Sequence, residues 1–93
     1  MDYEVILELL KIDLQINVSK IDALLMTYIE SAETEITARG INLVFGDTSD
    51  QLLVEEYAAW KYRTRAEKDA PMPLMVKAHL NNRLLSEKAR GDS

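Results

Sequence analysis

The sequence predicts a small all-α fold, a bundle of about four helices with two short extended connectors. Apolar side chains recur every three or four positions in four separate segments, the spacing that gathers them on one face of a helix. Helix start and stop signals flank the clearest segment, and Gly or Pro residues separate the later ones. With 93 residues the chain is expected to form a single helical domain, residues 1–93, and self-association is a common way for so small a core to gain stability.

The first helix is expected over residues 2–11, where Val5, Ile6, Leu9 and Leu10 share a face. Residues 12–18 then alternate apolar and polar side chains. This period of two predicts an extended segment with one face buried.

The second helix, within residues 19–40, is the most clearly defined element. Ser19 is expected to be its N-cap, and Gly40 to supply the left-handed residue at its C-terminus. The apolar stripe of this helix predicts a single buried face. We interpret the glutamates on the outside as a solvated face, the alternative being a surface that meets a basic partner. They are Glu30, Glu33 and Glu35.

A third helix is expected from about Asp50 to Lys68, after a turn at Gly46 and with Asp47 or Ser49 as its cap. Its apolar residues fall in three directions, so the helix is apolar nearly all round and should be buried on several sides. Two arrangements satisfy this requirement. Either the helix is central in the bundle, or one of its sides meets another subunit.

A fourth helix is expected from about Leu74 to Arg90, after a break at Pro71 and Pro73. Its apolar residues point in two directions, so it too offers more apolar surface than one neighbour covers. The first direction contains Leu74, Ala78, Leu85 and Ala89, and the second contains Val76, Leu80 and Leu84.

The charge of the chain is unevenly distributed. Residues 1–60 hold 12 acidic and 3 basic side chains, a net charge of −9, whereas residues 61–93 hold 4 acidic and 8 basic, a net charge of +4. These opposite charges can neutralise each other inside one molecule or between neighbouring copies. The total of −5 argues against a free-standing nucleic-acid binder, which would usually be basic.

No pattern typical of catalysis or of metal binding stands out. His79 is the single histidine, and its helical neighbours Met75 and Arg83 offer neither a metal ligand nor an orienting acid, so we interpret it as structural. A phosphate-binding loop, a nucleophile elbow and a thiolate site are all missing from the sequence. We therefore expect no enzymatic activity, no cofactor and no metal, and no membrane association, because no apolar run is long enough to span a bilayer.

Four segments in order resemble the small head–tail connector proteins of tailed bacteriophages, also called head-completion or DNA-packaging adaptor proteins. The segments are "LLKID", "YIESAE", "QLLVEEYAAWKYRTR" and "PLMVKAHLNNRLL", and the resemblance extends from about Val5 to Leu85. It implies a structural subunit that forms a homo-oligomeric ring below the portal protein and extends the DNA channel. A tail-proximal head-completion protein would bind next, and DNA would pass without sequence recognition. The location implied is the virion head–tail junction, with the host cytoplasm during assembly.

Within this hypothesis the surplus apolar surface of the last two helices forms the subunit interface. We expect the separated charges to suit a head-to-tail contact, so that two charge reversals among the basic residues weaken assembly more than folding. The alternative function is a small helical protein–protein interaction or regulatory module that acts as a dimer. The expected interface residues are Val54, Ala58, Tyr62, Val76, Leu80 and Leu84, and the expected charge contacts are Lys61, Arg63, Arg65, Glu30 and Glu33.

Overall fold

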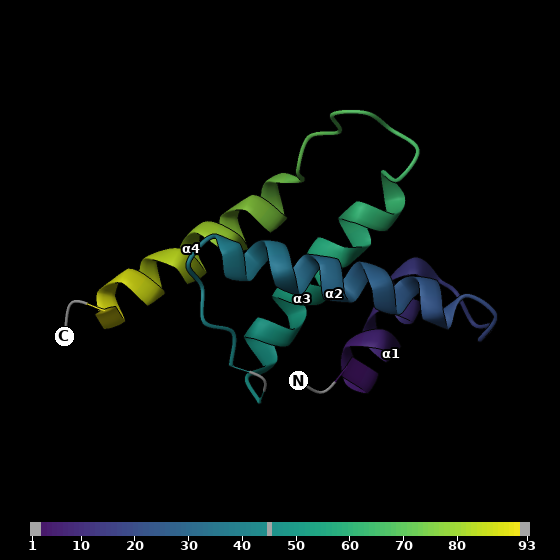
Figure 1. The fold of residues 1–93 in the computed structure, drawn as a ribbon, viewed down its shortest axis with the longest axis horizontal. Coiled ribbons are helices and arrows are strands. Elements are labelled where there is room, and N and C mark those ends of the chain that lie inside the picture. Colours follow the sequence, from purple (N-terminus) through teal and green to yellow (C-terminus); the bar gives the residue numbers. More distant parts are fainter. Residues whose placement is uncertain (1–2, 45, 92–93) are drawn as a thin grey trace.

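The computed structural model describes residues 3–44 and 46–91, in which four helices and no strands enclose one hydrophobic core (Figure 1). The predicted all-α fold is therefore confirmed. Residue 2, at the expected start of the first helix, lies outside the described residues. The helices are α1 (Tyr3–Leu14), α2 (Asp22–Ala38), α3 (Thr48–Arg63) and α4 (Leu74–Gly91).

Helix α3 is the central element of the fold. It packs against α1, α2 and α4, and its largest interface is with α2. Its side chains at Leu53, Val54, Tyr57 and Ala58 are almost completely buried, as is Ala59. Of the two arrangements that its sequence allowed, the central position within one chain is the one observed.

The extended segment predicted for residues 12–18 is wrong in its first half, because α1 continues to Leu14. The continuation keeps Leu14 in phase with Ile6 and Leu10, so a third apolar side chain packs on the core. Gln15 then adopts a left-handed conformation, with φ of 58°. The N–H of Ile16 donates to the carbonyl of Lys11 at 2.9 Å, which completes a Schellman motif with a non-glycine residue at its turn.

The predicted N-cap of the second helix is also wrong, because α2 begins at Asp22 and not directly after Ser19. Residues 19–21 form a separate turn in which the N–H of Asp22 donates to the carbonyl of Ser19 at 3.2 Å. The Asp22 carboxylate pairs with Lys11 of α1 at 3.0 Å, which joins the start of α2 to its neighbour. The stop signal is confirmed, since Gly40 has φ of 98°.

Helix α3 begins at Thr48, two residues before the predicted start, with Asp47 of the two expected caps, and it ends five residues early. Asp47 caps it by accepting the N–H groups of Ser49 at 2.8 Å and Asp50 at 3.3 Å. At the other end the helix stops at Arg63 instead of Lys68, where Thr64 leaves helical geometry and the N–H of Arg65 donates to the carbonyl of Tyr62 at 3.3 Å.

Helix α4 packs on α3 and extends past the other helices toward one end of the molecule, while α1 lies toward the other (Figure 1). The molecule measures 46 × 30 × 18 Å along its principal axes. A polar network fixes α4 in this position. Arg83 donates through Nε to the buried carboxylate of Asp50 at 2.8 Å and through Nη2 to the carbonyl of Asn42 at 2.7 Å. Glu87 accepts the N–H of Asn42 at 2.8 Å, so α4, α3 and the link between α2 and α3 meet here.

Candidate functional site

The structure places the predicted interface residues inside the single chain. Four of them, Val54, Ala58, Val76 and Leu80, are at most 6% exposed and belong to the core between α3 and α4. Tyr62 and Leu84 are partly buried against the same core. These side chains are brought together, but by intramolecular packing, and they offer little surface to a neighbouring subunit.

The predicted charge contacts are mostly engaged inside the molecule. Lys61 pairs with Glu35, Arg63 pairs with Asp13 at 3.0 Å, and the guanidinium of Arg65 lies 3.9 Å from the ring centre of Tyr62. The charges of Lys61 and Arg63 are therefore neutralised by acids of the same molecule, whereas Arg65 contacts an aromatic ring. Of the two acids, Glu33 accepts the Tyr3 hydroxyl at 2.9 Å, and Glu30 is exposed.

The surplus apolar surface of α4 lies on the predicted direction of Leu74, Ala78, Leu85 and Ala89, all exposed, and extends to Met75, which neither predicted direction included. Leu74 and Met75 are each 81% exposed and Leu85 is 64% exposed, with the exposed Ala78 on the same side. We call these four residues the α4 outer face. Two exposed lysines, Lys77 and Lys88, lie along one edge of it, and the exposed Asn81 and Asn82 lie within it.

Helix α1 carries a second exposed apolar stripe. Val5 is 40% exposed, Ile12 is 73% exposed, and the half-buried Leu9 lies between them at helical spacing. We call these three residues the α1 outer face. Glu4 and Glu8 are exposed beside it, and both line an open hollow together with Val5 and Leu9. The two outer faces are apolar centres with opposite charges at their edges.

A buried carboxyl group lies where α1 meets α3. Glu55 is 6% exposed, and burial, together with a hydrogen bond to Asp13, raises its pKa from 4.5 to about 8. The same hydrogen bond, with a further one from Arg63, lowers the pKa of Asp13. Sequence reasoning missed this pair. The sequence did contain an indication of a buried acid, because Glu55 lies between Val54 and Tyr57 in a helix that is apolar nearly all round.

His79 has partners that its own helix could not reveal. Nδ1 lies 3.0 Å from Oε2 of Glu56 and Nε2 lies 3.2 Å from Oγ of Ser49, both on α3. A carboxylate can only accept, so Nδ1 is the nitrogen that donates to Glu56, which leaves Nε2 facing the Ser49 hydroxyl. A serine bonded to a histidine that is bonded to a glutamate is the arrangement of a catalytic triad, in which histidine is the base that activates the serine. However, the carboxylate of Asp47 occupies the N–H groups of Ser49 and Asp50 beside it, so an oxyanion would meet negative charge there. The arrangement acts as a polar link between α3 and α4.

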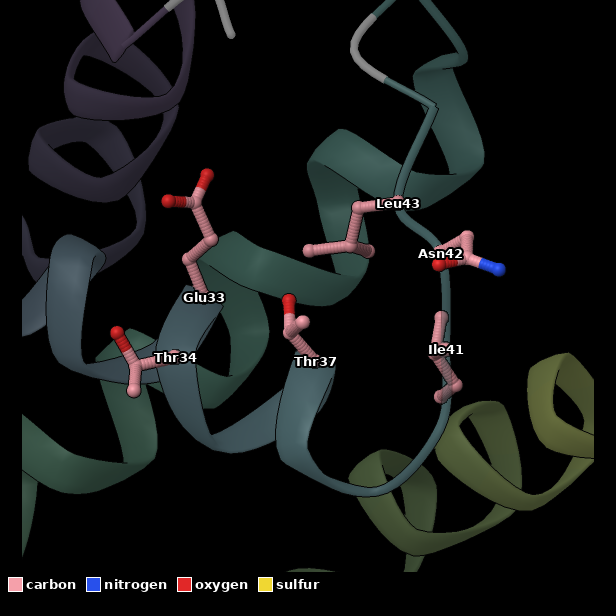
Figure 2. A pocket seen from close by; sticks show the side chains of 6 residues that line it. All are labelled: Glu33, Thr34, Thr37, Ile41, Asn42 and Leu43. Carbon is pink, nitrogen blue, oxygen red and sulfur yellow. The ribbon is translucent and has the colours of Figure 1, made fainter.

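A hollow at the end of α2 is shown in Figure 2, between Glu33, Thr34 and Thr37 of the helix and residues 41–43 of the link. Two of its polar side chains are engaged elsewhere: Glu33 accepts from Tyr3, and the Thr34 hydroxyl donates to the carbonyl of Glu30 at 2.9 Å. Among the described residues, no group of three His, Cys, Asp or Glu side chains is placed to hold a metal ion.

Within the same part of the chain, no helix combines the length and apolar character that crossing a bilayer requires. No protein-family model matches the chain, and no similar curated protein or solved structure was found. The two outer faces are consequently the features of this fold from which a function can be argued.

Proposed function

We propose that the chain is a non-catalytic adaptor subunit of a tailed-bacteriophage head–tail junction, which forms a ring below the portal and extends the DNA channel. The observation that carries the proposal is the presence of two exposed apolar faces, on α1 and on α4, with acids beside one and lysines beside the other. A subunit with two different complementary surfaces binds head-to-tail, and such contacts close into a ring when the rotation between copies allows it.

The order of the helices also supports this role. The segments that resemble the connector family form α1, α2, α3 and the first two-thirds of α4, and they enclose one core. The net charge of −5 suits a channel through which DNA slides, because an acidic wall does not bind phosphates. Copies of the chain, the portal protein and a tail-proximal head-completion protein are the partners in this proposal, and the assembled location is the virion head–tail junction.

Negative-stain electron microscopy tests the proposal directly. The concentrated protein is imaged alone and after mixing with isolated portal rings, with portal rings alone as the control. We expect closed rings of one diameter, seated coaxially on the portal when it is present. A compact dimer under both conditions would contradict the proposal and would favour the alternative, a small dimeric interaction module.

A further inference from the structure

The two outer faces differ in charge as well as in position. On α4, Lys77 and Lys88 lie along one edge of a strip that runs from Leu74 to Leu85 and includes the exposed Asn81 and Asn82, and on α1, Glu4 and Glu8 lie along one edge of the strip from Val5 to Ile12. At 1.5 Å per residue the strips are about 16 Å and about 10 Å long, so the α1 strip fits within the length of the α4 strip.

We infer that the α4 outer face of one copy packs against the α1 outer face of the next copy, with its lysines beside Glu4 and Glu8. This inference rests on the proposed function only in taking a second copy of the chain as the occupant. It replaces the interface first expected at the α3–α4 junction, where the side chains are already buried in the core.

Charge distinguishes this contact from the two self-pairings. If the α4 outer face met its own counterpart antiparallel, lysines would approach lysines, and if the α1 outer face did so, glutamates would approach glutamates. Pairing one face with the other, in the orientation that puts their charged edges together, brings opposite charges together along one side of the apolar strip. Ala78, near the middle of the α4 strip, is small enough for the two helix axes to approach to about 8–10 Å.

Burial of these strips gives the contact its free energy. Leu74, Met75, Ile12 and Leu85 are each more than 60% exposed in the single chain, so each has most of its apolar area left to bury. The flanking charges select the partner and the direction of the contact more than they strengthen it.

The absence of cysteine from the sequence makes a clean cross-linking test possible. Ile12→Cys and Ala78→Cys are made in separate copies, and a short flexible bismaleimide is added at a concentration where the unmodified protein sediments as an associated species. We expect a cross-linked dimer when the two variants are mixed and little from either variant alone. Equal cross-linking of one variant with itself, no cross-linking in the mixture, or no association of the unmodified protein would overturn the contact.

Charge exchange gives a second, independent readout. Glu8→Lys or Lys77→Glu alone should weaken association about fivefold, as expected for the loss of roughly 1 kcal/mol from a charge pair, and the double variant should recover most of it. Glu67→Lys and Lys20→Glu make the same changes of charge at exposed positions outside both faces and should leave association unchanged. If the controls weaken association equally, net charge and not the contact is responsible.

These experiments separate the contact from the ring. Rings that form without the mixed cross-link would disprove the contact and leave the adaptor role in place. A mixed cross-link in open filaments, with no closed ring even on the portal, would disprove the adaptor role and leave the contact in place.

Discussion

Glu55 and Asp13 occupy one site at the α1–α3 contact, yet their pKa values move in opposite directions. Glu55 is buried, and one of its carboxyl oxygens, Oε2, has no hydrogen-bond partner among the described residues. Burial penalises the charged form, so Glu55 keeps its proton at neutral pH, when Asp13 and Arg63 beside it are charged. Glu56, the next residue along α3, adds to the negative charge that holds the proton on Glu55.

Stability should therefore fall as the pH rises from about 4.5 to about 8. Over this range the unfolded chain has released the Glu55 proton while the native chain retains it, so deprotonation favours the unfolded state. Glu55→Gln mimics the protonated acid, and we expect it to remove this slope and to stabilise the protein at pH 8 by on the order of 3 kcal/mol. Urea denaturation at several pH values measures the effect, with the exposed Glu30→Gln as the matched control. A slope that persists in Glu55→Gln would refute the assignment.

Asp50 and Arg83 form the most buried ion pair of the described residues, with side chains 2% and 9% exposed. Asp50→Ala would leave the guanidinium of Arg83 without its principal partner, and we expect a loss of about 3–5 kcal/mol in the free energy of unfolding. Asp47→Ala, three residues away on the same helix end, removes only an exposed cap and should cost about 1 kcal/mol. Thermal unfolding compares the two variants, and equal losses would show that the buried pair is not decisive.

At the scale of elements, α1 illustrates how packing overrides a local pattern. The alternation of residues 12–18 favours an extended chain, but a further helical turn places Leu14 on the core, and the helix then ends in a strained left-handed residue, Gln15. The additional turn also leaves Ile12 exposed on the α1 outer face. A boundary that differs by one turn thus decides which residues are available for a partner.

Gln15→Gly should stabilise the protein by about 0.5–1 kcal/mol, because glycine adopts positive φ without the steric cost that a β-carbon brings. Gln15→Ala retains the β-carbon and should not stabilise. Chemical denaturation of both variants measures the difference. If glycine destabilised as much as alanine, relief of strain at this turn would not be the relevant effect.

At the scale of the whole molecule, the charge separation is only partly neutralised inside one chain. Lys61 and Arg63 pair with acids of the same molecule, so reversing them acts on folding as well as on assembly. Lys77 and Lys88 are exposed on α4 and form no ion pair within the described residues, so they are better positions at which to change association alone.

Self-association should weaken as salt is raised from about 0.05 M to about 0.5 M, because screening acts on exposed charges within a Debye length of about 4–14 Å. Sedimentation velocity across this range measures the change. Sodium sulfate at matched ionic strength is the control, since it also strengthens apolar burial and should weaken association less. Association that does not respond to sodium chloride would show that the opposite charges do not meet between copies.

The sequence by itself determined the number and type of the elements, because each helix carries its own apolar period, and Gly40 and Asp47 mark ends that local geometry dictates. Only the tertiary structure decided which of two apolar directions on α4 is covered, because both have the same local spacing and the choice depends on where Asp50 holds Arg83. It likewise decided the partners of His79 and Glu55, which come from other helices. Periodicity reports that a face is apolar, but which face is buried depends on contacts between residues far apart in the chain.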